Sequence, residues 1–305
     1  MLWTIQGISI PFLYSQQEAN FSLYMFNHQV INPAYTGTHD YTQITLVNHS
    51  QWLQIEGAPQ TQALSISNLF SDKVGLGVSL VNDQIGPTQK TNASIDFGYH
   101  LNLNKQNLKL SLGLKVSNRF NTIDYSMLNV LEQTDLSFVS QAENNSHLNF
   151  GVGFYLYNKR FYLGLASPFL LENDFTNTKR NYYLILGGLI RLNDSFELKP
   201  SLLFQSIEGT NTVYDNSIWI VFKNQFWIGP QYRSSVKNIL PSPSSSGHFG
   251  AIAGVHLNKS MSLGYAYQGK VGNQSIGITN TSHEIVLRIR LVPNQRNIVI
   301  SPRIF

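Results

Sequence analysis

The residues that could do chemistry in this chain form no catalytic or metal-binding pattern. The 305-residue sequence contains no Cys, which excludes disulfides, thiolate zinc ligands and thiol nucleophiles. Eight His residues are scattered along it, and His248 and His256 share one strand face but lie too far apart to bind one metal together. Ser, His and Asn are plentiful, yet there is no Gly-x-Ser-x-Gly element and no carboxylate pair stands out. We therefore expect no enzyme, no cofactor and no metal site.

Two glycine pairs have the spacing of short phosphate-binding loops. Gly75-Leu-Gly77 and Gly151-Val-Gly153 both lie inside alternating strand patterns, and neither opens a helix as a nucleotide site requires. Glycine inside a strand more often marks a small inward position or the close approach of another backbone. We interpret both pairs in that way. The 21 basic and 17 acidic residues form no nucleic-acid cluster, so we expect no nucleic-acid partner.

The elements that must position any site are long strands with one apolar and one polar face. Apolar residues alternate with polar or small ones over residues 92–101, 108–117, 249–257, 261–267 and 285–291. Strict alternation predicts a strand. A tilted strand needs about 9–11 residues to cross a bilayer, whereas ordinary strands average about five or six.

The composition agrees with a membrane barrel. Hydrophobic residues make up 42% and aromatic residues 12%, but only 12% are charged, against roughly 25% in a typical soluble domain. Neutral polar residues, including 30 Asn, replace the missing charge. The aromatic content argues against disorder, and no run of about 20 apolar residues could form a membrane helix. A transmembrane β-barrel and a large soluble β-protein, such as an adhesin or lectin domain, remain.

The pattern predicts fourteen strands, an even number as in single-chain bacterial outer-membrane barrels. They begin near Tyr41, Thr61, Val74, Thr91, Asn107, Leu148, Arg160, Asn181, Phe196, Val213, Gln225, His248, Met261 and Ser282. Pro200 and Pro230 fall inside predicted strands, where each removes a ladder donor and indicates a bulge. Trp52, Trp219 and Trp227, with many Tyr residues, are candidates for girdles at the membrane interface.

The connections alternate between long and short in chain order. The six short ones are residues 68–73, 102–106, 158–159, 193–195, 223–224 and 258–260. The seven longer ones are residues 53–60, 82–90, 121–147, 168–180, 206–212, 233–247 and 269–281. Barrels of the up-and-down type have short periplasmic turns and long outer loops. The sequence therefore predicts an all-β fold, a transmembrane up-and-down antiparallel β-barrel with both ends on the periplasmic side.

Four regions follow from this pattern. Residues 1–15 are interpreted as an atypical signal peptide, because they are apolar but lack a positive n-region. Residues 16–40 form an N-terminal segment expected in the lumen or at the periplasmic mouth. Residues 41–291 form the outer-membrane barrel, and residues 292–305 form a C-terminal periplasmic tail.

Several sequence blocks resemble those of the PorP/SprF family. Phe21-Ser-Leu-Tyr-Met-Phe-Asn27, followed by Ile31-Asn-Pro-Ala-Tyr-Thr-Gly37, resembles the start of the mature family proteins, although His28 stands where a small or proline-like residue is expected. Gln51-Trp52 with Glu56-Gly-Ala-Pro-Gln-Thr-Gln62 is similar to the first hairpin, and residues 74–87 are similar to the most recognisable block. Later blocks are Leu198-Lys-Pro-Ser201, Trp227-Ile-Gly229 with Tyr232-Arg233, Ser282-His-Glu-Ile285 and Ile300-Ser-Pro-Arg-Ile-Phe305. The resemblance covers residues 16–305.

The resemblance implies an outer-membrane protein associated with type IX secretion and gliding motility in Bacteroidota. Such a barrel helps to secrete or anchor a large surface protein or adhesin by binding its C-terminal domain. The implied partners are this secreted cargo, other type IX secretion components and outer-membrane lipid. Neither catalysis nor a cofactor is implied.

Two groups of residues are candidates for that role. The N-terminal segment, whose aromatic residues need burial, is expected to plug the lumen or bind the partner through Phe21, Tyr24, Met25, Phe26, Asn27, Asn32, Pro33, Tyr35 and Gly37. The loop residues of the family-like blocks are Trp52, Glu56, Gly57, Pro59, Asn82, Asp83, Gly86 and Pro87. The outer loops, above all residues 121–147, are expected to face the cargo. The alternative is a diffusion porin or small-solute transporter, which requires an open lumen.

Overall fold

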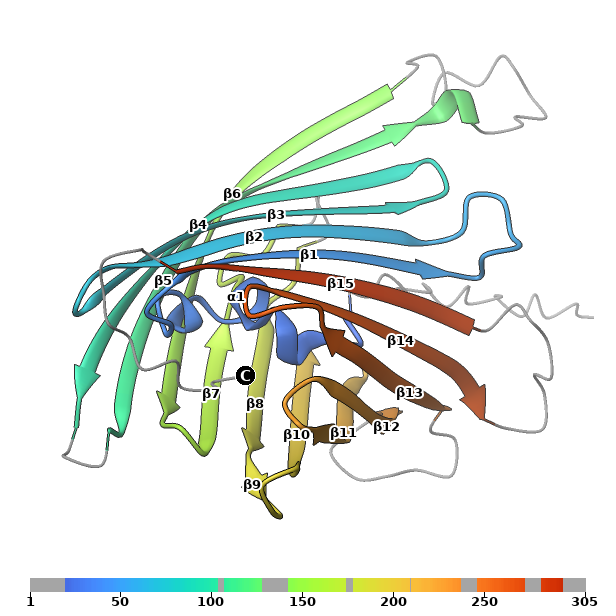
Figure 1. Ribbon diagram of the computed structural model, residues 1–305. Helices are drawn as coiled ribbons and strands as arrows, with labels where there is room; N and C mark the ends of the chain where they lie inside the picture. The colour runs from blue at the N-terminus through green and yellow to red at the C-terminus, as the bar shows by residue number, and fades with distance from the viewer. Residues whose placement is uncertain are drawn as a thin grey trace, which may run out of the picture.

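The chain forms one closed β-barrel around its own N-terminal residues (Figure 1). The computed structural model describes residues 20–103, 107–127, 142–173, 178–208, 210–236, 246–271 and 281–292, so the predicted signal peptide and nearly all of the predicted tail lie outside the described residues. Successive strands pair antiparallel, and the first strand pairs with the last to close the sheet. Closure satisfies within the protein the backbone hydrogen bonds that lipid cannot make. The predicted up-and-down barrel is confirmed.

Fifteen labelled strands make up the fourteen strands of the barrel. Their bounds are β1 Thr42–Gln51, β2 Gln60–Ser71, β3 Val74–Ile85, β4 Thr88–Asn102, β5 Lys109–Asp124, β6 Ala142–Tyr157, β7 Phe161–Ser167, β8 Asn181–Gly188, β9 Ile190–Arg191, β10 Phe196–Ile207, β11 Thr212–Phe222, β12 Phe226–Val236, β13 Ser246–His256, β14 Met261–Val271 and β15 Thr281–Leu291. Because β8 and β9 both pair with β10, they are two parts of one strand.

Both prolines lie inside strands, and each disturbs the sheet on one side only. Pro200 of β10 pairs with Ile218 of β11, while the break between β8 and β9 lies on its other side. Pro230 of β12 pairs with Ala251 of β13, while the β11–β12 register skips the pair at Pro230 and the one beside it. Proline lacks an N–H, so the ladder is lost only where that N–H would point.

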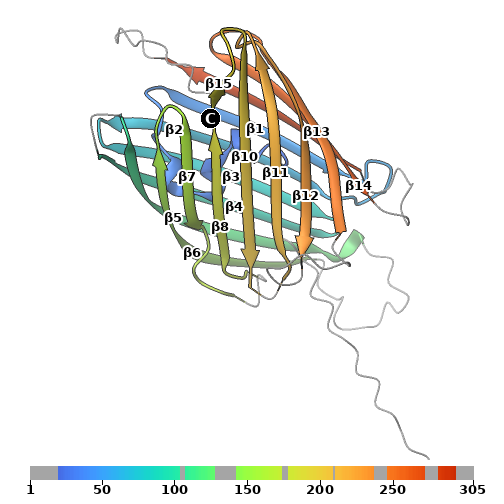
Figure 2. The ribbon, with the colours of Figure 1, turned by 90° about the horizontal axis from the view of Figure 1, so that it is seen from below.

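The outside of the barrel is apolar and the inside is polar or small. On β3, Leu76, Val78 and Leu80 are exposed on the outer face, and Gly75 and Gly77, which alternate with them, lie on the inner face. This alternation suits lipid outside and a polar lining inside. Figure 2 shows the strands on the two sides of the barrel crossing at a steep angle, as expected for tilted strands.

Two of the three predicted girdle tryptophans are not at the membrane interface. Trp219 and Trp227 are only 4% and 3% exposed, because both fall on the inward phase of their strands. That prediction is wrong for both residues. Trp52 lies just beyond β1 and is 38% exposed.

The strands end at two rims, which we call the turn rim and the loop rim. The turn rim carries the connections at residues 72–73, 103–108, 158–160, 192–195, 223–225 and 257–260. The loop rim carries those at residues 52–59, 86–87, 125–141, 168–180, 208–211, 237–245 and 272–280. The two sets alternate along the chain as predicted, but the predicted difference in length fails at residues 86–87, a two-residue connection at the loop rim.

One predicted long loop, at residues 82–90, is wrong. The polar residues there continue β3 and β4, which are joined by the two-residue turn Gly86-Pro87 with a φ of +53° at Gly86. Asn82 accepts hydrogen bonds from the Thr91 hydroxyl (2.9 Å) and the Gln89 amide (2.7 Å). Cross-strand side-chain pairs of this kind make a polar strand where composition alone indicates a loop.

β6 extends well beyond its neighbour β7. All of β6 pairs with β5, but only residues 152–157 pair with β7. The N–H of Leu170 donates to the carbonyl of Phe150 (2.9 Å), and the preceding Phe169 is buried with its ring centroid 4.3 Å from Cζ of Arg119. Among the described residues, no strand pairs with the second edge of β6 at residues 142–149.

The N-terminal residues fold into three short helices inside the barrel: η1 Tyr24–Phe26, α1 His28–Ile31 and η2 Pro33–Tyr35. The Asn32 side chain accepts the N–H of Ala34 (2.9 Å), and Pro33 takes the first position of η2, a favourable start for a helical turn. Figure 1 shows these helices in blue, enclosed by the strands. No helix among the described residues is long and apolar enough to cross a membrane.

The described part of the N-terminal segment, from residue 20 onward, runs along the lumen from one rim to the other. Ser22 contacts Glu284 near the loop-rim end of β15, and β1 begins at Thr42 at the turn rim. We expected the chain ends on the short-turn side, but the first described residues lie nearer the loop rim.

Candidate functional site

A row of inward glycines lets the N-terminal segment lie flat against the barrel wall. The row consists of Gly75, Gly77, Gly98, Gly113 and Gly153, on strands β3 to β6. A Cβ atom at Gly113 would lie 2.1 Å from the backbone nitrogen of Ala34, and one at Gly75 would lie 2.2 Å from the carbonyl oxygen of Thr36. Only glycine permits so close an approach of two backbones. The interpretation of Gly75-Leu-Gly77 and Gly151-Val-Gly153 as close-approach positions is confirmed.

Side chains of β4 and β6 hold the turn-rim end of the segment. Nε2 of His100 hydrogen-bonds to the carbonyl oxygen of Thr36 (3.0 Å), and the other ring nitrogen hydrogen-bonds to the Tyr157 hydroxyl (3.1 Å). Asn32 donates from its amide to the carbonyl of Phe154 (3.0 Å). Gly37 has a φ of +78°, so the turn beside this contact also requires glycine.

A buried ion pair meets the middle of the segment. Nζ of Lys115 lies 2.8 Å from Oδ1 of Asp96, and neither side chain is more than 1% exposed. The amide of Gln29 donates to Oδ2 of Asp96 (3.1 Å) and to the carbonyls of Ile66 and Val78 (3.2 and 3.1 Å). A buried ion pair is tolerated only when further hydrogen bonds satisfy its atoms, and Gln29 supplies such bonds.

An aromatic and cationic pocket encloses Phe26. Its ring stacks on Trp227 with centroids 4.8 Å apart and planes at 27°. The guanidinium carbon of Arg288 lies 4.8 Å from the Phe26 ring centroid, and Arg288 also donates to the carbonyl oxygen of Phe26. Stacking and cation–π contacts in a desolvated site are each worth about 1 kcal/mol or more.

Tyrosines of β6 and β7 surround the first two helices. The hydroxyls of Tyr24 and Tyr162 both hydrogen-bond to Oγ of Ser201 (2.8 and 2.7 Å). Nδ1 of His28 hydrogen-bonds to the hydroxyl of Tyr155 (3.2 Å). Burial, aided by the nearby positive charge of Arg288, lowers the pKa of His28 to about 3, so this ring is neutral at neutral pH. Burial likewise raises the pKa of Tyr24.

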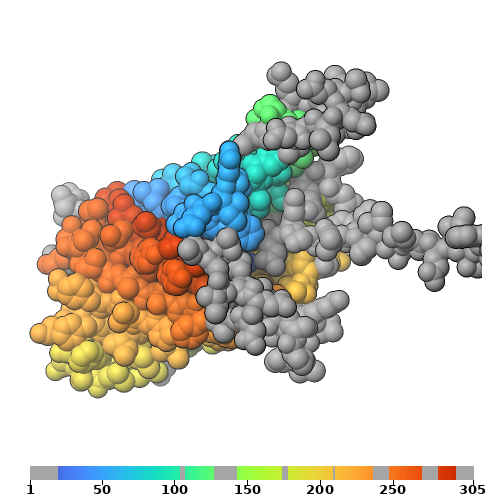
Figure 3. All heavy atoms as spheres, turned by 90° about the vertical axis from the view of Figure 1, so that its right-hand side faces the viewer, coloured from blue at the N-terminus to red at the C-terminus, as the bar shows by residue number. Residues whose placement is uncertain are grey.

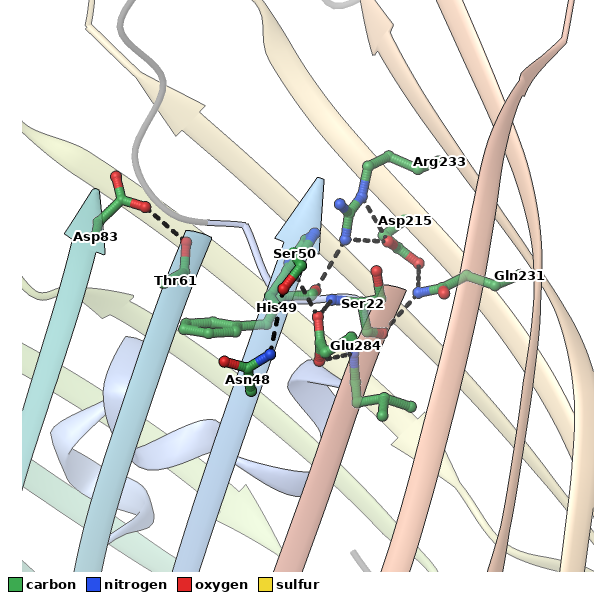
Figure 4. A network of polar contacts seen from close by, with 12 residues as sticks. Ser22, Asn48, His49, Ser50, Thr61, Asp83, Asp215, Gln231, Arg233 and Glu284 are labelled. Atoms are coloured by element: carbon green, nitrogen blue, oxygen red, sulfur yellow. Dashed lines mark hydrogen bonds and ion pairs between the residues drawn. The ribbon is translucent and has the colours of Figure 1, made fainter. Parts of the chain in front are cut away.

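A carboxylate near the loop rim binds the start of the segment, as Figure 4 shows. Glu284 accepts the backbone N–H of Ser22 (2.6 Å) and of Leu23 (2.8 Å). Nδ1 of His49 lies 3.1 Å from the same carboxylate. Hydrogen bonds to a charged acceptor are roughly twice as strong as neutral ones, so this contact is a firm anchor.

Three side chains of β11 and β12 complete this anchor (Figure 4). Nε and Nη2 of Arg233 both lie 2.8 Å from Oδ2 of Asp215. Nη2 of Arg233 also donates to the carbonyl of Phe21 (2.8 Å), and Gln231 donates to the carbonyl of Ser22 (2.7 Å) and to Oδ1 of Asp215 (2.7 Å). Side chains of the wall therefore bind the main chain of the segment. Glu284 accepts from its N–H groups, while Gln231 and Arg233 donate to its carbonyls.

The inward-facing groups described above bind the main chain of the protein's own N-terminal segment. The buried carboxylates of Asp96, Asp215 and Glu284 all engage cations, N–H groups or a histidine. In the part of the chain that the structure describes, no group of three or more His, Asp or Glu residues could hold a metal ion.

The structure places all nine candidate residues of the segment inside the barrel. Phe21, Tyr24, Met25, Phe26, Asn27, Asn32, Pro33, Tyr35 and Gly37 are buried. Each therefore faces the barrel wall or the rest of the segment.

The eight candidate loop residues lie in and beside two loops that touch. The N–H of Gly86 donates to the carbonyl of Gly57 (2.9 Å), and φ is positive at both glycines. Asp83 accepts a hydrogen bond from the Thr61 hydroxyl (2.6 Å), and Asn82 accepts those described above. The N–H of Asp124 donates to the carbonyl of Pro87 (2.9 Å), while Trp52 and Glu56 are exposed and Pro59 is buried. Figure 3 shows the β1–β2 loop, in blue, projecting at the loop rim.

Sequence reasoning missed the charged residues of the wall. Asp96, Lys115, Asp215, Glu284 and Arg288 all occupy inward positions of their strands. The sequence did contain a signal for them, because a charged residue on the polar face of a predicted membrane strand indicates a position that faces the lumen. Three of the later family-like blocks contain Ser201, Trp227, Arg233 and Glu284, so blocks that carry the resemblance also contact the segment.

Comparison with known proteins confirms the resemblance. A family model described as "Type IX secretion system membrane protein PorP/SprF" matches residues 13–289. No curated protein matches the chain in sequence.

Among solved structures, the chain is similar in fold to three outer-membrane or channel proteins. The CymD monoaromatic hydrocarbon channel has 12% identity and a TM-score of 0.49, covering 88% of this chain and 92% of that one. The outer membrane protein Omp33 of Acinetobacter baumannii has 7% identity and a TM-score of 0.47, covering 84% and 100%. The KdgM porin has 10% identity and a TM-score of 0.39, covering 81% and 98%.

Proposed function

The chain belongs to the PorP/SprF family of type IX secretion system membrane proteins and is an outer-membrane β-barrel, and from this we propose that it binds a secreted cargo protein. The cargo is a large surface protein or adhesin, held through its type IX C-terminal domain. The barrel helps to deliver this protein to the cell surface or to anchor it there, together with other components of the secretion system. Where the adhesin serves gliding, the barrel serves gliding as well.

The observation that carries the proposal is the N-terminal segment held inside the barrel from one rim to the other. The N-terminal segment is bound by Glu284 near the loop rim, by Asp96 and Lys115 midway, and by His100 near the turn rim. A diffusion porin needs a water-filled path past these contacts. The geometry therefore favours a plugged barrel that works through its rims over a solute channel.

The loop rim offers a surface suited to a protein partner. Trp52, Leu53 and Ile55 on the β1–β2 loop are 38%, 61% and 45% exposed. Large apolar side chains clustered on a loop are typical of interface anchors. The Gly57–Gly86 backbone contact fixes this loop against its neighbour, which reduces the entropy lost on binding. We propose that the cargo contacts this loop and the connection between β5 and β6, which the sequence predicts to face the cargo.

The test compares cargo capture by the unaltered barrel with capture by a variant of the β1–β2 loop. A tagged barrel is crosslinked in native membranes, isolated and analysed by mass spectrometry. We expect peptides of a secreted protein with a type IX C-terminal domain. The double variant Trp52→Ala/Ile55→Ala should bind it at least about thirtyfold more weakly, since two interface anchors of about 1–2 kcal/mol each contribute at least about 2 kcal/mol together.

A matched control is Phe70→Ala/Leu257→Ala, which removes two exposed apolar residues at the turn rim. This control should keep its cargo. Equal cargo recovery from both variants, or no secreted protein recovered with the unaltered barrel, contradicts the proposal.

A further inference from the structure

The turn rim carries a ring of exposed cations that the proposed function does not use. Five of its six connections have an exposed Lys or Arg within them or directly beside them. These residues, which we call the cation collar, are Lys73, Lys159, Arg160, Arg191, Lys223 and Lys259. At the remaining connection, Lys109 begins β5 and is partly exposed. The cations are therefore spread around the rim of the barrel and are not gathered on one side of it.

Exposed apolar residues accompany the collar at each of these five turns. They are Phe70, Phe161, Ile190, Leu192, Phe222, Phe226 and Leu257, all between 37% and 75% exposed. Nζ of Lys223 lies 5.3 Å from the centroid of the Phe222 ring. An apolar body with a cationic tip is the side-chain arrangement that sits where hydrocarbon meets headgroups. The collar therefore lies at a membrane interface, at the end of the apolar band.

The charge of the collar is not neutralised by acids at the same rim. Among the described residues of the turn rim, only Asp72 and Asp194 are exposed acids, against six exposed cations. Glu197 is partly buried and lies 3.6 Å from Arg191. The net charge of this exposed ring is therefore positive.

The loop rim has the opposite character. Its exposed acids in the described ranges are Glu56, Glu143, Glu172 and Glu208, and these ranges contain no exposed Lys or Arg there. Arg180 is partly exposed and pairs with Glu172 at 3.0 Å. The overall excess of four positive charges thus hides a separation of charge between the two ends of the barrel.

We propose that the cation collar binds the anionic headgroups of the phospholipid leaflet that surrounds the turn rim. Short turns of bacterial barrels face the periplasm, where the outer membrane presents phospholipids. Lys and Arg at a membrane surface gain attraction from anionic lipid over about a Debye length. The collar fixes the depth and the orientation of the barrel in its membrane, and the acidic loop rim disfavours the inverted orientation.

The experiment compares thermal unfolding of the full chain in two kinds of vesicle. The barrel is reconstituted into phosphatidylcholine alone and into phosphatidylcholine mixed with phosphatidylglycerol, and unfolding is followed by the mobility shift on unboiled gels. We expect the midpoint to be several degrees higher in the anionic vesicles at low salt. The difference should vanish at about 1 M salt, where the Debye length falls to about 3 Å.

Two variants with equal charge change locate the effect. Lys159→Gln/Lys259→Gln removes two collar cations and should lose about a third of the midpoint difference between lipids. Lys90→Gln/Lys179→Gln removes two cations from the loop-rim side and should keep the whole difference. Because each variant is compared with itself in two lipids, a general loss of stability does not affect the result.

Three results would overturn the inference. The first is an equal midpoint for the unaltered barrel in both lipids. The second is a lipid difference that survives high salt. The third is an equal loss in the two double variants, which would mean that the preference follows total charge and not the collar.

Discussion

At the scale of single residues, the glycine row decides whether the N-terminal segment fits. A methyl group at Gly113 has no space, because the Ala34 backbone already occupies the position of its Cβ. Overpacking of this kind costs about 1–3 kcal/mol when neither backbone can move aside. This cost destabilises the state in which the N-terminal segment is bound to the wall. The segment should therefore dissociate from the wall more readily, before the strands separate.

Gly113→Ala should therefore lower the unfolding midpoint in detergent and expose the segment to protease. Gly188→Ala is a matched control on the same barrel, since its Cβ would lie 3.6 Å from the nearest atom, an ordinary contact. The measurement is the loss of gel mobility with temperature, together with cleavage of the N-terminal residues by added protease. Equal behaviour of the two variants would show that the glycine row does not determine how the segment is held.

His28 should make the stability of the seated segment depend on pH. Its pKa is about 3 in the folded barrel, because burial and the charge of Arg288 disfavour the imidazolium, against about 6.5 in the unfolded chain. Above pH 6.5 both states are neutral and the residue contributes no pH dependence. As pH falls from 6.5 toward 3, only the unfolded chain takes up the proton, so stability is lost, by about 2 kcal/mol at pH 5.

The check is the slope of the unfolding midpoint between pH 7 and pH 5. His28→Gln should show a shallower slope than the unaltered barrel, while Asp and Glu titration gives the same background in both. Parallel slopes would mean that His28 is not the group that titrates.

At this scale, the sequence predicted which residues are buried better than it predicted which residues they contact. Tyr24, Phe26 and Tyr35 were expected to need burial from their size and apolarity alone, and the structure buries them. Glu284 could not be matched with Ser22 in advance, since they are 262 residues apart and meet only through the register of the closed sheet. Trp227 was misplaced because its inward phase depends on strand boundaries that composition does not fix.

At the scale of elements, β6 offers a strand edge that no described strand covers. The carbonyl of Phe150 accepts a hydrogen bond from the N–H of Leu170, and the N–H of Phe150 donates to the side-chain oxygen of Asn149. Even-numbered residues of β6 therefore direct their backbone groups away from β5. Residues 144, 146 and 148 therefore present N–H and C=O groups on that side. Their outward side chains, apart from Leu148, are polar, which places most of this edge beyond the apolar band.

Proline substitution can test this assignment of the edge. Ser146→Pro should change the unfolding midpoint little, because its N–H does not belong to the β5–β6 ladder. Asn145→Pro should lower it, since the N–H that pairs with β5 is lost, at a cost of about 1 kcal/mol or more. The two are adjacent residues of one strand, so an equal effect would show that β6 is covered on both edges.

The number of strands could be predicted because period-two alternation is strong in membrane strands. The alternation of turns and loops followed from the same pattern. The prediction failed at residues 82–90, because Asn82 and Asp83 are polar residues on a strand. Asp83 accepts a hydrogen bond from Thr61 of β2, and Asn82 accepts one from Thr91 of β4. The interruption at Gly188 and Ile190 also depends on Pro200 in the next strand, which local sequence does not reveal.

At the scale of the whole molecule, the seated segment should close the barrel to ions. In planar bilayers we expect no stable conductance steps from the unaltered protein, because its lumen is occupied along its length. Deletion of residues 20–38 should produce steps, since the polar inner wall would then line a water-filled path. Trp52→Ala/Ile55→Ala is the control and should stay closed. Steady conductance of the unaltered barrel would favour the porin alternative.

The membrane barrel as a whole was predictable because low charge, high aromatic content and long alternating strands coincide in few other folds. The direction in which the N-terminal segment passes through the lumen was not. That direction follows from anchors on β11, β12 and β15, which no local pattern links to Phe21 or Ser22.

The position of Glu284 and Arg288 on the last strand has a consequence for assembly. Ser22, Leu23 and Phe26, near the start of the described chain, are held by β15, the last described strand, which also pairs with β1 at the closing seam. A chain that lacks β15 cannot close its sheet and cannot secure Ser22, Leu23 or Phe26 through these side chains. Contacts this distant in sequence form late in folding, because their loop-closure entropy is paid last. The seated N-terminus is thus a mark of a completed barrel, and an unfinished one would display a loose apolar tail to chaperones and proteases.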